Sequence, residues 1–275
     1  MNLPTKQYTV HRLQQEHMHE EVDCLVVEEP LEIRVNNQTL GVVMRTPGHD
    51  FDLARGFLLS EGIFPARESN THLKTLRLDC ARDEFGLEIP NVVSCALPDL
   101  SAEHLQACQR QMVATSSCGI CGRASLERVR LQAPKLAGGF SISMPTLKSL
   151  SARIAENQTT FAATGGLHAA SLFENSGAII LVREDIGRHN AVDKVLGAAL
   201  LEHAHPLSNF GLWVSGRLSF EMAQKALLAG IPFVAAVSAA SSLAVDLAQE
   251  TGMTLAGFLR NERAVIYTGK HRISF

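Results

Sequence analysis

The stretch that decides the fold is FGLWVSGRLSFEMAQKALLAGIPFVAAVSAASSLAVDLAQETGMTLAGF, residues 210–258. Short apolar runs at 210–214, 232–237 and 254–258 have the length and composition of buried strands. Between them, 219–228 and 241–249 carry apolar residues at helical spacing, and a glycine follows each segment. Strands that alternate with helices predict a mostly parallel sheet with helices packed on it.

The same pattern extends in both directions from this stretch. Upstream, 146–157 is a predicted amphipathic helix, and 168–173 and 178–182 are predicted strands joined by the turn residues Asn175, Ser176 and Gly177. Asn190 is expected to cap a helix that runs to about His203. Downstream, 264–267 is the last predicted strand. Residues 140–275 are therefore expected to form one α/β domain.

The first half of the chain predicts a smaller α+β domain. Alternating apolar residues at 31–35 and 40–44 flank an Asn-Asn turn, which is a hairpin signal. A helix at 51–59, strands at 73–78 and 87–96, and a helix at 101–113 capped by Ser101 are expected to follow. We expect a loose tail at 1–20, this domain at 21–115, and a mobile loop and linker at 116–139.

Composition describes an ordinary globular protein. Of the 275 residues, 46% are hydrophobic and 19% charged, the formal net charge is −3, and aromatics make up 5%. This balance does not favour nucleic-acid binding. No apolar signal core follows the N-terminus, and the most apolar stretch, 231–245, is too short to span a bilayer. We therefore expect a cytoplasmic protein with no membrane partner.

Polar segments follow the predicted strands at the edge where such sheets bind ligands. They lie at 185–190, 215–217, 238–241 and 260–263. Some of them open onto helix N-termini, whose N–H groups attract anions, and arginines recur among them. An anion pocket is predicted here, with candidate residues Arg188, His189, Arg217, Arg260 and Arg263.

A glycine-flanked cysteine pair, Cys118 and Cys121 in SCGICG, is the main chemical signal. A second Cys-x-x-Cys that would complete a zinc site is absent from the sequence, so zinc is not expected. Dithiol–disulfide exchange and an inert exposed pair both stay open. The hypothesis that we prefer is a nucleophilic thiolate that carries sulfur as a persulfide, on an accessible loop where Arg123 favours the thiolate. The other cysteines, at 24, 80, 95 and 108, are scattered and expected to be small core residues.

Several ordered strings together resemble one family, the formate dehydrogenase accessory sulfurtransferases (FdhD/NarQ family). They are EEPLEIRVN, GFLLSEGI, SSCGICG, GGLHAA, EDIGRHNAVDKVLG, GRLSFEMAQKA, AAVSAASSLAV and GFLRNERAVIYT, from about residue 28 to the C-terminus. The resemblance implies a sulfur carrier that takes sulfur from a cysteine desulfurase and gives it to the molybdenum cofactor, a bis(molybdopterin guanine dinucleotide). That cofactor then enters formate dehydrogenase, and a homodimer is implied.

The resemblance also implies residue roles. The persulfide falls on Cys118, with Cys121 assisting. The guanine-dinucleotide contact falls on a run after the last long strand, which is Phe258, Leu259, Arg260, Asn261, Glu262 and Arg263. Many members of the family carry glycine before the final arginine, where this chain has Asn261 and Glu262.

The family's C-terminal half resembles the cytidine deaminase fold, a mixed sheet with flanking helices. Zinc deaminases carry His-x-Glu and Pro-Cys-x-x-Cys. Here those places hold His189-Asn190-Ala191 and Ser215-Gly216-Arg217. We therefore expect a cytidine deaminase-like scaffold with no metal site and no deamination. A thiol oxidoreductase and a noncatalytic molybdenum-cofactor chaperone remain the alternative functions.

Overall fold

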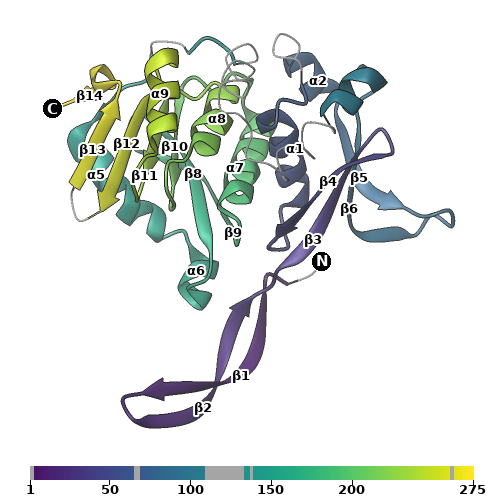
Figure 1. Cartoon of the computed structure of the whole chain (residues 1–275), viewed down its shortest axis with the longest axis horizontal. Helices are drawn as coiled ribbons and strands as arrows, with labels where there is room; N and C mark the ends of the chain where they lie inside the picture. The colour runs from purple at the N-terminus through teal and green to yellow at the C-terminus, as the bar shows by residue number, and fades with distance from the viewer. Residues whose placement is uncertain (1–2, 65–68, 109–132, 137–138, 261–262) are drawn as a thin grey trace.

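The computed structural model describes residues 3–64, 69–108, 133–136, 139–260 and 263–275. A layered α/β unit holds the C-terminal half, a smaller sheet and its helices stand beside it, and a narrow hairpin projects from the molecule (Figure 1). The chain is thus a mixed α/β protein, as predicted. Cys118, Cys121, Arg123, Asn261 and Glu262 lie outside the described residues.

The central sheet has six strands in the order β13-β12-β11-β10-β8-β9. They are β8 (His168–Glu174), β9 (Ile179–Asp185), β10 (Phe210–Val214), β11 (Phe233–Ala236), β12 (Thr254–Arg260) and β13 (Arg263–Thr268). Only β10, β11 and β12 run parallel among these strands, and the other pairings are antiparallel. The sheet is therefore mixed, not mostly parallel, because hairpins bound it on both sides.

Alternate residues of each strand face opposite layers of helices. Leu212 and Val214 of β10 pack in the larger cluster, under α7 (Arg188–Glu202), α8 (Phe220–Leu228) and α9 (Ser242–Thr251). Trp213, between them, packs in a second cluster under α5 (Met144–Ala155). The short helix α6 (Thr159–Thr164) follows α5. A two-stranded sheet of β7 (Ile142–Ser143) and β14 (Ile273–Ser274) closes the far end, after the 3-10 helix η1 (Lys270–Arg272).

Side-chain caps begin two of these helices. Ser143 accepts a hydrogen bond from the Thr146 amide at the start of α5, and Ser241 does the same for the Ala244 amide at the start of α9. The predicted cap at Asn190 is wrong. The N-cap of α7 is Gly187, and the Asn190 amide donates instead to the Met44 carbonyl and to Asp185 Oδ1.

The N-terminal sheet has the order β4-β3-β6-β5. Its strands are β3 (Glu29–Val35), β4 (Gln38–Arg45), β5 (Arg77–Arg82) and β6 (Glu88–Ala96), and α1 (Asp50–Ser60) packs beside it. The predicted hairpin and first helix are confirmed. The predicted strand at 73–78 is wrong in its first half, which belongs to α2 (Ser69–Thr75). Residues 102–108 are helical, and the Ser101 hydroxyl accepts from the His104 amide.

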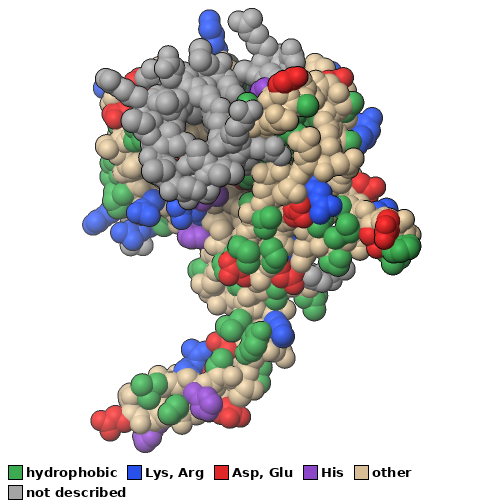
Figure 2. All heavy atoms as spheres, turned by 45° about the vertical axis from the view of Figure 1, so that its right-hand side comes forward, with side chains coloured by type: hydrophobic (Ala, Val, Ile, Leu, Met, Phe, Trp, Pro, Cys, Tyr) green, Lys and Arg blue, Asp and Glu red, His purple; other side chains and the backbone are tan. Residues whose placement is uncertain are grey.

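Residues 5–26 form an antiparallel hairpin of β1 (Thr5–Gln14) and β2 (His17–Val26). The expected loose tail is therefore wrong over most of its length. The hairpin extends away from the body, with mixed charged and apolar side chains on its surface (Figure 2). The sequence signal is weak because histidine, glutamate and arginine interrupt the apolar alternation; backbone pairing and cross-strand ion pairs such as Arg12–Asp23 join the two strands.

Helix α1 lies against α7 with almost no side chain between the two backbones. A Cβ on Gly56 would lie 1.8 Å from the Asp193 carbonyl oxygen, and a Cβ on Gly197 would lie 1.8 Å from the Asp52 carbonyl oxygen. One hydrophobic cluster accordingly runs from Leu31 in the N-terminal sheet to Leu255 in the central sheet. The predicted domain boundaries stay predictions, but both sheets share this core.

Buried charges strengthen the same junction. Lys225 Nζ on α8 donates to Ser60 Oγ at 2.8 Å, to Glu61 Oε1 at 2.8 Å and to Asp193 Oδ2 at 2.9 Å. Burial alone lowers the pKa of Lys225, but Asp193 and Glu61 outweigh it and raise that pKa, so the ammonium group stays charged. These residues belong to three of the strings that carry the family resemblance, which therefore meet in a structural network.

Candidate functional site

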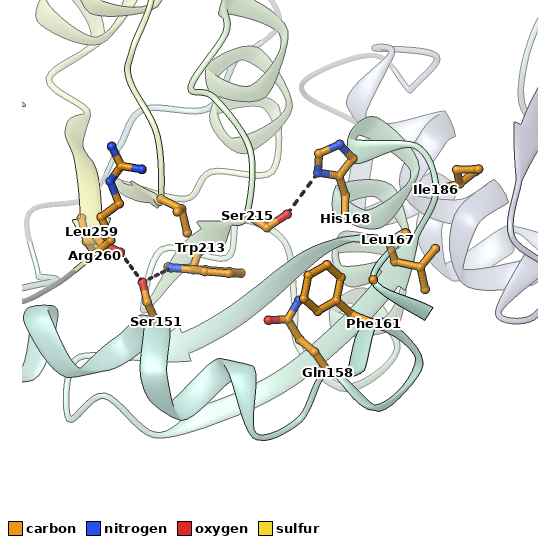
Figure 3. A pocket seen from close by; sticks show the side chains of 13 residues that line it. Ser151, Gln158, Phe161, Leu167, His168, Ile186, Trp213, Ser215, Leu259 and Arg260 are labelled. Carbon is orange, nitrogen blue, oxygen red and sulfur yellow. Dashed lines mark hydrogen bonds between the residues drawn. The ribbon is translucent and has the colours of Figure 1, made fainter. Parts of the chain in front are cut away.

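A pocket of about 580 Å³ lies at the edge of the central sheet where β9, β10, β11 and β12 end. Figure 3 shows its lining side chains. They are Ser151, Gln158, Phe161, Gly165, Gly166, Leu167, His168, Ile186, Trp213, Ser215, Val237, Leu259 and Arg260. The predicted location, beyond the carboxyl ends of the strands, is where this pocket is found.

His168 and Ser215 form a hydrogen-bonded pair on one wall. Ser215 Oγ accepts from the Ala169 amide at 3.0 Å and lies 3.2 Å from His168 Nδ1. Either the hydroxyl or the ring nitrogen can be the donor in this pair, depending on the tautomer of the imidazole. Burial, and then the charge of Arg188, lower the pKa of His168. The imidazole is thus neutral at pH 7.

Two arginines bring positive charge to this region. Arg188, at the start of α7, and His168 both lie against Gly216. A Cβ added to Gly216 would be 3.6 Å from Arg188 Cδ and 3.9 Å from His168 Nδ1, so the two side chains are neighbours. The Arg260 guanidinium lies over the Phe258 ring at 5.9 Å. Among the described residues no carboxylate lies within 4 Å of either guanidinium, and Glu221 is near enough to Arg188 for the two charges to interact. Cations without a carboxylate partner favour an anionic ligand.

A hydrogen-bonded chain forms the floor of the pocket. Trp213 Nε1 donates to Ser151 Oγ at 3.0 Å, and Ser151 Oγ donates to the Leu259 carbonyl oxygen at 2.7 Å (Figure 3). Ser151 comes from α5, Trp213 from β10 and Leu259 from β12. The hydroxyl therefore joins a helix to two strands at the point where the candidate binding run begins.

The structure brings only some of the predicted site residues together. Leu259 and Arg260 line the pocket, Phe258 adjoins them, and Arg263 lies opposite Arg260 in the β12–β13 pairing. Arg188 reaches the wall beside His168. Arg217 is exposed and does not line the pocket.

His189 points to a different environment. Burial, then Lys225 and Arg188, lower the pKa of His189 to about 4, whereas Glu221 and Glu61 oppose that shift. Lys225 and Glu61 belong to the junction with α1, Arg188 lies beside His168, and His189 is not among the residues that line the pocket. Arg188 and His189, which are neighbours in the polar segment 185–190, therefore have different surroundings.

Sequence reasoning missed the pocket roles of His168, Ser151 and Trp213. His168 begins a strand, and a lone histidine at a strand end has no spacing that distinguishes it from an ordinary surface residue. Ser151 follows Leu150 within an amphipathic helix, where it reads as a surface position. Only the contacts of the folded chain show that both reach the same pocket.

Neither a metal site nor a membrane-spanning helix is found in the described residues. In the parts of the chain that the structure describes, no cluster of three or more His, Cys, Asp and Glu side chains is placed to hold a metal ion. Among the helices of those same parts, none has both the length and the apolar character needed to cross a bilayer.

Fold and pocket define an α/β protein whose mixed sheet carries, at the carboxyl ends of its strands, a pocket lined by Arg260 and bordered by Arg188. The sequence model of the FdhD/NarQ family matches residues 26–274, and the chain belongs to this family. It is 49% identical over 253 residues to the sulfur carrier protein FdhD of Nocardia farcinica, across 91% of this chain and 88% of that protein. It is 41% identical to the sulfur carrier protein FdhD of Sulfurisphaera tokodaii, across 98% of this chain and 100% of that protein.

A solved structure has the same fold. It is a crystal structure of a candidate formate dehydrogenase accessory protein from Desulfotalea psychrophila. The TM-score is 0.75 and the sequence identity is 24%. The superposition covers 99% of this chain and 100% of that chain. At this identity the likeness concerns the fold.

Proposed function

We propose that this protein is a cytoplasmic sulfur carrier, a sulfurtransferase that serves the maturation of formate dehydrogenase. The observation that carries the proposal is family membership together with the Cys-x-x-Cys motif: relatives that are nearly half identical over most of the chain are sulfur carrier proteins, and thiolates are the groups that carry sulfur. A cysteine desulfurase is the donor in this proposal, and a homodimer is the working form.

The first step places sulfur on Cys118. The Cys118 thiolate attacks the terminal sulfur of the donor's persulfide, a new S–S bond forms, and the donor leaves as a thiolate. In the second step Cys121 attacks the inner sulfur of the Cys118 persulfide. The terminal sulfur leaves as hydrosulfide for the acceptor, and the pair closes as a disulfide. Atoms and electrons balance in both steps without an outside reductant.

The acceptor in this proposal is the molybdenum cofactor in its bis(molybdopterin guanine dinucleotide) form. Its phosphates suit a pocket that is lined by Arg260 and the neutral His168 and is bordered by Arg188, which lies beside the His168 ring. We assign the guanine-dinucleotide contact to residues 258–263, of which Leu259 and Arg260 line the pocket. The cofactor is bound as substrate, and the scaffold is cytidine deaminase-like in this proposal, in keeping with the strand order 13-12-11-10-8-9.

Reconstituted maturation tests the proposal. Purified protein, a cysteine desulfurase, cysteine, the molybdenum cofactor and cofactor-free formate dehydrogenase are combined, and formate oxidation is followed. We expect activity with the natural chain, and none with Cys118→Ala. A noncatalytic chaperone predicts full activity for Cys118→Ala, and that result would overturn the proposal. Cys80→Ala is the matched control, because Cys80 lies on β5 of the N-terminal sheet.

A further inference from the structure

Ser151 is a polar residue on the packing side of an otherwise apolar helix face. The buried residues of α5 are Leu147, Leu150 and Ile154, and Ser151 lies one helical turn after the first of them. A hydroxyl that loses water on such a face costs free energy unless it finds partners. Ser151 uses both of its roles, because it accepts from Trp213 and donates to the Leu259 carbonyl.

The backbone that Ser151 holds is irregular. The pairing of β12 with β13 shifts register between Gly257 and Arg260, and Phe258 has a φ of 55°. Positive φ is unfavourable for a residue with a side chain and persists only where the surroundings impose it. Two hydrogen bonds do so here: the Phe258 amide donates to the Ser238 carbonyl at 3.1 Å, and the Leu259 carbonyl accepts from Ser151 at 2.7 Å.

This irregular turn determines where Arg260 points. A bulge re-aims the side chains that follow it. Here the first residue of β12 that pairs with β13 again after the bulge is Arg260, which lines the pocket and lies over Phe258. If the Leu259 carbonyl were released, the φ of Phe258 would lose one of its constraints and the chain would relax toward ordinary strand geometry. Arg260 would then leave its present direction.

We propose that Ser151 is a positioning residue that fixes the bulge at 257–260 and so aims Arg260 at the anionic part of the ligand. The ligand belongs to the proposed function, so this inference rests on it; the positioning itself is a property of the ligand-free chain. Ser151 contacts the Leu259 carbonyl through its hydroxyl and acts on the ligand through Arg260.

The test compares Ser151→Ala with Ser149→Ala and Ser151→Thr. Ser149 lies on the same helix and its hydroxyl donates to the Thr146 carbonyl at 2.9 Å, away from the pocket. Trp213 is the chain's single tryptophan, so its emission reports this pocket alone. Guanosine diphosphate is the ligand probe, and hydrogen exchange of a peptide that covers residues 255–260 is measured without ligand.

For Ser151→Ala we expect a shifted Trp213 emission, faster exchange at 258–260 by about fivefold, and a guanosine diphosphate dissociation constant about tenfold higher, as the loss of one hydrogen bond implies. Ser149→Ala should match the natural chain, and Ser151→Thr should restore both exchange and affinity. Unchanged exchange at 258–260 in Ser151→Ala would overturn the positioning role. If the natural chain does not respond to guanosine diphosphate, the proposed cofactor site fails, while exchange in the ligand-free chain still decides the role of Ser151.

Discussion

The contact between α1 and α7 leaves no room for a single methyl group. In Gly197→Ala, the new Cβ would lie 1.8 Å from the Asp52 carbonyl oxygen and 2.8 Å from the Gly56 amide nitrogen. Ordinary contact begins near 3.4 Å, so one helix must retreat by about 1.5 Å, because both obstructing atoms belong to backbone and cannot rotate away.

The expected cost follows from overpacking. Forcing an extra carbon into a packed core costs about 1–3 kcal/mol, and the upper end applies where backbone must move. Alanine gains up to about 1 kcal/mol over glycine in a helix. We therefore expect Gly197→Ala to lower the free energy of unfolding by about 2 kcal/mol, which corresponds to a fall in Tm of about 3–4 °C for 275 residues.

Equilibrium urea unfolding and thermal scans measure this change. Gly41→Ala is the control, since a Cβ on Gly41 would meet nothing within 4 Å, and both variants stiffen the unfolded chain alike. If Gly197→Ala proves as stable as Gly41→Ala, the close approach of α1 and α7 is not what joins the two sheets.

Two further variants probe the same junction. Lys225→Met leaves the Asp193 carboxylate buried without its ammonium partner, so it should lower the free energy of unfolding in urea by about 3–5 kcal/mol, and adding Asp193→Leu should recover part of that loss. Lys74→Met, at an exposed lysine, should change the free energy of unfolding by less than about 0.5 kcal/mol. Equal effects of Lys225→Met and Lys74→Met would contradict the network. Burial, followed by the charges of Lys225 and Arg188, lowers the pKa of His189 from 6.5 to about 4 in the folded chain. As the pH falls from 6.5 toward 4, the unfolded chain therefore binds a proton before the folded chain does. The free energy of unfolding decreases over this range, by at most about 3 kcal/mol. His189→Gln should flatten this acid limb of the urea midpoint while the exposed His271→Gln leaves it unchanged, and identical limbs would refute the assignment.

The predicted order of elements from 146 onward agrees with the structure because each has a strong local signal. Strand β10 has the predicted bounds, and α9 begins at its Ser241 cap and ends at Gly252, whose φ is 73°. Buried strands are continuously apolar and helices end at glycine, so pattern and fold coincide there. The pocket's location followed from the same order, because strand ends share one edge.

The predictions that were wrong concern features that depend on tertiary contacts, which a local sequence pattern does not contain. The β1–β2 hairpin is solvated on both faces, so its sequence lacks a clean alternation. Asn190 has the residue type of a cap, but its amide reaches Met44, 146 residues earlier. His189 and Arg188 are adjacent in sequence, yet one faces the junction with α1 and the other the His168 wall. The bulge at Phe258 places a non-glycine residue at positive φ, which no local rule predicts.

Direct detection of sulfur on Cys118 is the measurement closest to the central claim. The protein is incubated with a cysteine desulfurase and cysteine, and intact and peptide masses are recorded for the natural chain, Cys118→Ala and Cys121→Ala. Burial raises the pKa of the Cys95 thiol to about 12, so that cysteine should stay unmodified and serve as an internal control. We predict one added sulfur atom on the peptide with residues 118–121, absent in Cys118→Ala and present in Cys121→Ala. No sulfur gain in Cys121→Ala, where the pair cannot close as a disulfide and release the sulfur, would contradict the sulfur-carrier account and identify a redox pair instead.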